Sequence, residues 1–139
     1  MSSAHHAAAP FPLRLPPGAD LRRALQAELL TQGQRAGFVL AGIGSLCGAA
    51  LRLAGAREPL LLTGDIEILS LSGSLSPDGA HLHISLADAD GRVLGGHVAP
   101  GCLVRTTAEL LLLWLPDWDF AREPDPATGY PELRVRPRA

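Results

Sequence analysis

One stretch near the N-terminus has the periodicity of an amphipathic helix, and it constrains the fold more than any other feature. Asp20 is a good N-cap residue, and Leu21, Leu25 and Leu29 follow it at intervals of four, so that they share one helix face. Gly33 is a natural C-terminal stop. A helix with one apolar face must bury that face against another element. We therefore predict one main helix that packs on a sheet.

The segment from residue 66 to residue 75 is the clearest strand. Leu69, Leu71 and Leu75 alternate with serines, which predicts a strand with one buried apolar face and one face lined by hydroxyl groups. Ile66 and Ile68 have the opposite parity to these leucines. We therefore expect either a β-bulge at this point or a strand that is buried on both sides.

The remaining strands are predicted from short apolar segments that turn residues separate. They are expected at residues 37–43, 49–53, 60–62, 81–86, 92–98 and 103–115, with hairpin turns at residues 77–79 and 88–91. The proline-rich segment from Pro116 onward is expected to be irregular. The predicted fold class is α+β, a mainly antiparallel β-sheet packed against one main α-helix.

The length of 139 residues suits a single domain. We expect a flexible leader over residues 1–11, the folded domain over residues 12–133 and a basic tail over residues 134–139. His5 and His6 fall in this leader and are interpreted as incidental. Cys47 and Cys102 are expected to be small buried apolar residues, because no CxxC motif is present. With no signal peptide pattern and no apolar run long enough to span a bilayer, a cytoplasmic protein without membrane contact is expected.

The charge pattern argues against sequence-specific DNA binding. The formal net charge is −2, whereas a domain that neutralises several phosphates carries a clustered excess of Lys and Arg. The one basic cluster is the tail from Arg134 to Arg138, which resembles an AT-hook core with Val135 in place of the glycine. Weak binding of nucleic acid by this tail is left open.

Six stretches, in this order along the chain, resemble a known family. They are Leu15-Pro16-Pro17-Gly18-Ala19-Asp20-Leu21, residues 36–44, residues 67–73, His81-Leu82-His83, residues 90–97 and residues 128–133. Together they make the chain similar to the PPC (plants and prokaryotes conserved, or DUF296) family, whose stand-alone prokaryotic members are often labelled as DNA-binding. The resemblance implies an α+β fold and assembly into homotrimers. Asp65 stands where the plant members have an arginine, so no role of that arginine is carried over.

Three of the five histidines fall in one predicted hairpin. His81 and His83 are two apart in a strand and project from the same face. If the loop is centred on Asp90, His83 lies directly opposite His97, with Cβ atoms roughly 4.5–5.5 Å apart and His81 as the diagonal neighbour. Three imidazoles then converge on one divalent transition metal ion, for which zinc is the first candidate and nickel, copper or iron also fit.

The metal prediction depends on the register of this hairpin. A two-residue turn at Asp90 and Gly91 sends His97 to the opposite face, and no site then forms. The alternative interpretation is a set of ordinary strand histidines, hydrogen-bonded to Ser85 or to the backbone. In the metal interpretation, Gly95 and Gly96 leave space beside His97 for a ligand or water.

Glu67 is the other candidate polar group. Flanked by two isoleucines, it is expected to be partly buried and to need a partner such as Arg105. Three functions remain open from the sequence. They are a homotrimeric binding or regulatory module that holds a metal ion or small molecule near the histidines, a metal-dependent enzyme that activates water with Glu67 as acid or base, and a DNA-binding protein.

Overall fold

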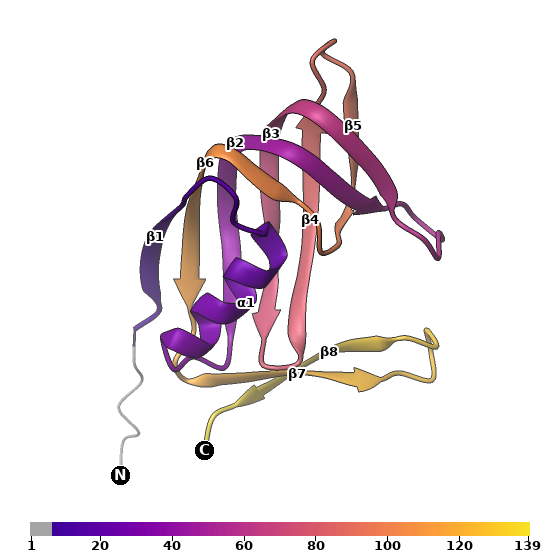
Figure 1. Cartoon of the computed structure of the whole chain (residues 1–139). Coiled ribbons are helices and arrows are strands. Elements are labelled where there is room, and N and C mark those ends of the chain that lie inside the picture. Colours follow the sequence, from indigo (N-terminus) through magenta and orange to yellow (C-terminus); the bar gives the residue numbers. More distant parts are fainter. Residues whose placement is uncertain (1–6) are drawn as a thin grey trace.

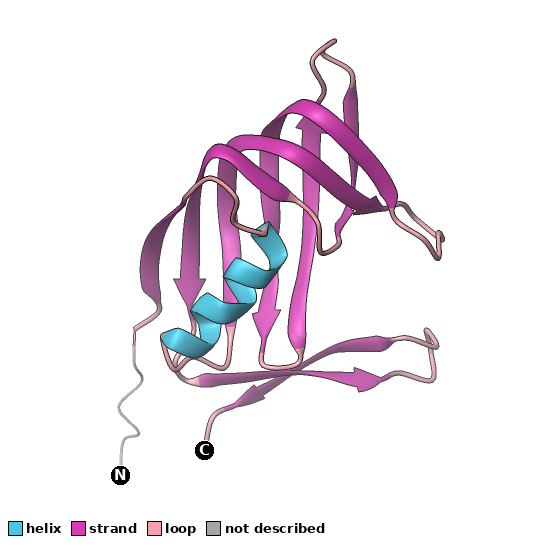
Figure 2. Ribbon diagram, viewed as in Figure 1, coloured by secondary structure: helices cyan, strands magenta, loops and turns pink. Residues whose placement is uncertain are grey.

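The structure is a computed structural model, and it describes residues 7–139. Its elements are β1 (Ala9–Leu15), α1 (Leu21–Thr31), β2 (Gly37–Arg52), β3 (Leu60–Ser76), β4 (Gly79–Ala87), β5 (Val93–Val98), β6 (Leu103–Trp114), β7 (Trp118–Pro124) and β8 (Pro131–Pro137). His5 and His6 lie outside the described residues. The predicted α+β class is confirmed: one helix covers one face of a mainly antiparallel sheet (Figures 1 and 2).

The main sheet has six strands in the order β1-β6-β2-β3-β4-β5, and every pairing in it is antiparallel. The end of β2 also pairs with the end of β5, so β2, β3, β4 and β5 form a closed ring. In this closure Leu51 pairs with Val98, and Arg52 pairs with His97. The ring therefore brings β2 beside β5, although β3 and β4 separate these two strands in the strand order.

The helix has the predicted limits and the predicted buried face. Leu21, Leu25 and Leu29 are each no more than 1% exposed, so the stripe lies fully in the core. The Asp20 carboxylate caps the helix by accepting from the N–H of Arg23 at 3.1 Å, and its other oxygen accepts from the N–H of Gly101 at 2.7 Å. Asp20 therefore also ties the start of the helix to the loop before β6.

Of the two alternatives predicted for β3, the structure has the bulge. The register with β4 shifts between Ile68 and Ser70, which leaves Leu69 as the extra residue. Ile66 and Ile68 are buried before the shift and Leu71 is buried after it. Leu69 itself is 48% exposed, so the expectation that it joins the core face was wrong. Side chains alternate between the two faces of a strand. The extra residue therefore changes the core-facing side chains from the even-numbered residues before it to the odd-numbered residue after it.

Two pairs of predicted short strands are single long strands in the structure. Residues 37–43 and 49–52 belong to β2, which ends one residue before the predicted limit, and residues 60–62 and 66–75 belong to β3. The pairing of these two strands continues through a register shift between Leu46 and Gly48. Cys47 sits at this irregularity and is exposed, contrary to expectation, whereas Cys102 is fully buried. Burial raises the pKa of the Cys102 thiol.

The segment after Pro116 is not irregular, because β7 and β8 form an antiparallel hairpin there (Figure 1). Pro124 and Pro131 face each other at the ends of the two strands, where the missing N–H groups interrupt no ladder. Phe120 anchors the hairpin: it is 3% exposed and meets Phe38 edge to face at 5.7 Å. The hairpin therefore packs on the main sheet.

Both predicted terminal segments contain strand residues. Ala9 to Phe11, expected in the leader, begin β1, and the ring of Phe11 packs 5.6 Å from that of Trp114. The predicted boundary between domain and tail falls inside β8. Among residues 7–139, α1 is the only helix, and its eleven residues are too short to cross a membrane.

Candidate metal centre

The hairpin of β4 and β5 has the register that the metal prediction requires. His83 and His97 are direct cross-strand partners. The Asp88 side chain sets the loop, because its Oδ1 accepts from the N–H groups of Asp90 at 3.0 Å and Arg92 at 2.9 Å. The pairing resumes at Ala87 and Val93, so the loop does not close as a two-residue turn. The alternative register is therefore excluded.

The three histidines of the hairpin lie together. The ring centroids are 5.0 Å apart for His81 and His83, 5.3 Å for His81 and His97, and 4.6 Å for His83 and His97. One nitrogen from each ring can be chosen so that all three lie within 4.8 Å of one another. Tetrahedral zinc with bonds of about 2.0–2.1 Å requires ligand atoms about 3.3 Å apart. The nitrogens are therefore at most about 1.5 Å farther apart than that spacing, and the residue type and clustering of the three imidazoles suit a metal ion once rotation of the side chains closes this gap.

The histidine side chains face away from the core. Their neighbours Leu82, Ile84 and Val98 are buried on the opposite side of the strands. This alternation keeps the three imidazoles accessible to solvent on one face of the hairpin. A metal ion bound there has three protein ligands and at least one coordination position that is open to solvent or to a ligand.

The surroundings favour the neutral form of two of these imidazoles. Burial lowers the pKa of His81, the positive charge of Arg122 and the other two histidines lower it further, and Glu132 opposes the shift. Burial also lowers the pKa of His97, with contributions from Arg52, His83 and Arg22. A neutral imidazole is the form that binds a metal, so these shifts favour metal binding at neutral pH.

We expect the two shifts to appear in an NMR titration of the metal-free protein. Each of His81 and His97 should titrate below the ordinary value of 6.5. Since the folded state then binds protons less readily than the unfolded chain, metal-free stability should fall as the pH is lowered through about 6.5. The resonances are assigned with His81→Gln and His97→Gln variants. A pKa at or above 6.5 for both residues would contradict the burial and the neighbouring positive charges described for them.

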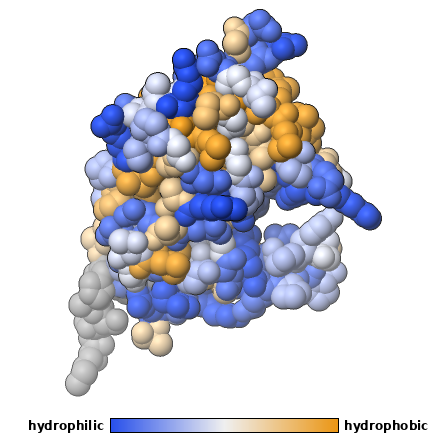
Figure 3. Space-filling model, viewed as in Figure 1, coloured by the Kyte–Doolittle hydropathy of each residue, from blue (hydrophilic) through white to orange (hydrophobic). Residues whose placement is uncertain are grey.

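The β7–β8 hairpin forms one wall of the site. A cavity of about 310 Å³ is lined by His81 and His83, by Phe38, Ser72, Gly73 and Ser74, and by Arg122, Glu132 and Leu133 of this hairpin. Arg122 fixes the wall in place, because its Nη2 donates to Ser74 Oγ at 2.7 Å and its backbone N–H donates to Asp78 Oδ2 at 2.8 Å. Figure 3 shows a hollow between the tip of the β2–β3 hairpin and the tip of the β7–β8 hairpin, which both project on the right of the molecule.

Sequence analysis missed Arg52, Arg122 and Glu132. The partner of Arg52 follows from the closure of β2 on β5, which no local pattern indicates. Arg122 and Glu132 come from the segment that was expected to be irregular. One signal was available there: residues 118–123 contain aromatic and charged side chains without proline or glycine, as a strand does.

Gly95 and Gly96 lie beside His97 in β5, where backbone atoms of neighbouring strands occupy the space that their missing side chains leave. A Cβ at Gly95 would lie 2.9 Å from the carbonyl oxygen of Ile84, and a Cβ at Gly96 would lie 3.0 Å from that of Arg52. The two glycines therefore allow close approach of β5 to its neighbours on both sides. Direct contact of either glycine with a ligand remains a prediction.

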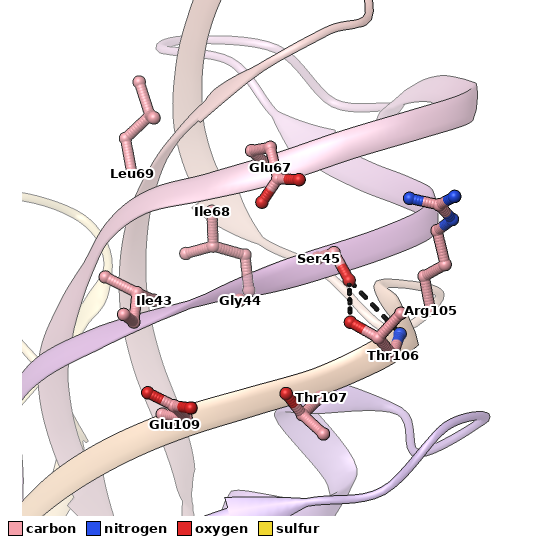
Figure 4. Close-up of a pocket in the computed structure, with 10 residues that line it drawn as sticks. All are labelled: Ile43, Gly44, Ser45, Glu67, Ile68, Leu69, Arg105, Thr106, Thr107 and Glu109. Atoms are coloured by element: carbon pink, nitrogen blue, oxygen red, sulfur yellow. Dashed lines mark hydrogen bonds between the residues drawn. The ribbon is translucent and has the colours of Figure 1, made fainter.

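Glu67 does not join the histidines. It is exposed, contrary to expectation, and Arg105 pairs with Asp65 at 3.2 Å instead. Glu67 and Arg105 line a separate open cavity of about 580 Å³ with Ser45, Thr106 and others (Figure 4). Ser45 Oγ and Thr106 Oγ1 are hydrogen-bonded there at 2.6 Å. The bulge at Leu69 explains why the expected burial of Glu67 was wrong. The extra residue changes which of the preceding side chains face the core, and Glu67 points away from it.

Comparison with known proteins agrees with this fold. A structure of a hypothetical protein from Salmonella enterica superposes with a TM-score of 0.92 at 42% identity, covering 97% of this chain and 99% of that one. A metal-containing protein from Archaeoglobus fulgidus superposes with a TM-score of 0.75 at 28% identity, covering 94% and 96%.

The matches also define the family. The model of the Plants and Prokaryotes Conserved (PCC) domain matches residues 2–116, and the chain belongs to this family, which is the one that the sequence motifs indicated. A bifunctional protein GlmU from Synechococcus sp. is 54% identical over 129 residues. That match covers 93% of this chain but 20% of the GlmU protein, so this chain corresponds to one part of a much longer relative.

Proposed function

We propose that this protein is a homotrimeric PCC-domain module that binds a divalent transition metal ion, zinc in the first instance, through His81, His83 and His97. The observation that carries the proposal is the convergence of the three imidazole rings on one solvent-facing side of the β4–β5 hairpin. The name of the Archaeoglobus fulgidus protein, which states that it contains metal, supports the same interpretation. When bound, such an ion supplies a Lewis acid with an open coordination position.

The support for the trimer is an apolar patch on the face of the sheet opposite α1. It consists of the exposed residues Leu40, Ile43, Leu69 and Leu111 on β2, β3 and β6. Leu40 and Leu69 both lie at register shifts, so bulges turn these two leucines outward. Contiguous exposed apolar residues of this kind mark interaction sites. In the apolar run of residues 110–115, Leu110 and Leu112 face the core instead, and Leu111 belongs to the patch.

A metal-dependent enzyme is the second candidate, and one contact favours it. Glu132 lines the same cavity as His81 and His83, and it therefore offers the acid or base group that sequence analysis assigned to Glu67. DNA binding is left out of the proposal. Arg134 and Arg136, the core of the basic tail, are ion-paired with Glu123, and Arg134 also with Asp125. Their charges are thus compensated within the hairpin.

Metal analysis by plasma mass spectrometry tests the proposal. We expect about one equivalent of metal per chain in tag-free protein after incubation with zinc, and a loss of at least tenfold in His97→Ala, because two remaining imidazoles leave an incomplete ligand set. A His5→Ala/His6→Ala double variant is the matched control and should keep the full equivalent. Wild-type protein without stoichiometric metal, or His97→Ala with as much metal as the wild type, would refute the metal site.

A further inference from the structure

Arg52 is placed beside the candidate metal centre by the closure of the strand ring. It pairs directly with His97, which pairs in turn with His83, so the three side chains form one row across β2, β5 and β4. Side chains that are direct partners across antiparallel strands lie on the same face of the sheet. Arg52 is exposed, and it has no ion pair with any carboxylate of residues 7–139. Its guanidinium is therefore free to contact a ligand at the site.

Two further arginines reach the same place from other elements. Arg22 extends from α1 and its Nη1 donates at 3.0 Å to the carbonyl oxygen of Val98, the residue after His97. Arg122 comes from β7 and lines the cavity with His81 and His83. Burial lowers the pKa of Arg22, and the charges of Arg122 and Arg52 lower it further against the effect of Asp20, so Arg122 and Arg52 each lie near Arg22.

Three carboxylates, Asp20, Asp78 and Glu132, lie near the three arginines, but among residues 7–139 none of them forms an ion pair with the guanidinium of Arg52 or Arg122. The two oxygens of Asp20 accept from the backbone N–H groups of Arg23 and Gly101, and Asp78 accepts from the backbone N–H of Arg122. Glu132 is the one carboxylate among the residues that line the cavity. The formal charges of the three arginines and the three carboxylates therefore balance, and a divalent ion on the histidines would make the site positive.

From this juxtaposition we infer that the site binds a small molecule with a carboxylate or phosphate group. One oxygen of that group takes the open position of the metal ion, and Arg52 and Arg122 donate hydrogen bonds to the remaining oxygens. Arginine suits this task, because its planar guanidinium matches the geometry of carboxylates and phosphates. The cavity of about 310 Å³ that His81, His83 and Arg122 line accommodates a small ligand, and Arg52 and His97 lie outside that lining, in the same cross-strand row as His83. The inference rests on the proposed metal site.

Calorimetric titration of the zinc-loaded protein tests the inference, with inorganic phosphate and acetate as separate probes at low ionic strength. We expect saturable binding of at least one probe at one site per chain, and an affinity at least tenfold lower in Arg52→Met. Methionine keeps the apolar stem and removes only the guanidinium. Arg14→Met, in β1 at the far edge of the sheet, is the control and should bind as the wild type does.

Metal content is measured on the same samples, so that the two proposals can fail separately. If zinc is stoichiometric and neither probe binds, or if Arg52→Met binds the probe as tightly as the wild type, the anion site is refuted and the metal site stands. If the wild type holds no zinc, both proposals are refuted. Binding of one probe and not the other identifies the ligand as a phosphate or a carboxylate. Weaker binding in Arg52→Met with full zinc occupancy supports the inference.

Discussion

Replacing Gly73 with alanine is expected to destabilise the protein on the order of 2–4 kcal/mol and to disrupt the histidine cluster. Gly73 lies in β3 with φ +153°, a backbone conformation that L side chains rarely adopt. An added Cβ would lie 2.0 Å from the carbonyl oxygen of His81 and 2.8 Å from the Cα of Leu82. Both neighbours are backbone atoms, so β3 and β4 must separate where β4 carries His81.

Urea unfolding at a fixed protein concentration measures the loss of stability, and metal content reports the histidine cluster. Gly48→Ala is the matched control. Gly48 is also a strand glycine, but its φ is not positive and the nearest atom to an added Cβ is 3.8 Å away. We expect the control to lie within about 0.5 kcal/mol of the wild type. Equal unfolding midpoints for Gly73→Ala and Gly48→Ala would show that β4 does not approach β3 as closely as described.

Replacing Ile43 with arginine is expected to convert the proposed homotrimer into a monomer. Ile43 is 55% exposed in the middle of the apolar patch, and in an assembly built on that patch a longer, charged side chain would have to lose its water beside its cross-strand neighbour Glu109. Light scattering should give three times the protomer mass of 14.6 kDa for the wild type and the single protomer mass for the variant.

Leu30→Arg is the control for this second experiment. Leu30 is 64% exposed on α1, on the other side of the sheet, so it tests whether any exposed leucine or isoleucine has the same effect. The control should keep the trimer mass. A monomeric wild type, or an Ile43→Arg variant that keeps the wild-type mass, would refute a trimer built on this patch.

The helix and the histidine hairpin were predictable because both depend on residues that are close in sequence. The N-cap at Asp20, the leucine stripe and the stop at Gly33 act within about three helical turns. The register of His83 with His97 follows from the loop at Asp88, whose side chain binds the N–H groups of residues two and four positions later. Local hydrogen bonds and side-chain periodicity suffice to place such features.

The environment of the histidines was not predictable in the same way. Arg52 reaches His97 because β2 bends through its register shifts and closes on β5, and Arg122 arrives from a hairpin held by the contact of Phe120 with Phe38. Glu67 was misplaced because one extra residue at Leu69 reverses strand parity. The placement of the two arginines depends on contacts between residues 45 positions apart, Arg52 with His97, and 82 positions apart, Phe38 with Phe120, which no local sequence pattern indicates.

The amino-acid sequence alone therefore predicts the helix, the shared face of His81 and His83, the approach of His97 in one of two registers, and the family. Strand closure, the wall formed by β7 and β8, and the charge around the histidines arise from tertiary packing. The physical reason is the range of the interactions. Capping, alternation and turn chemistry act over a few residues, whereas bulges and ring closure are set by how the buried face of the whole sheet packs against α1 and the core.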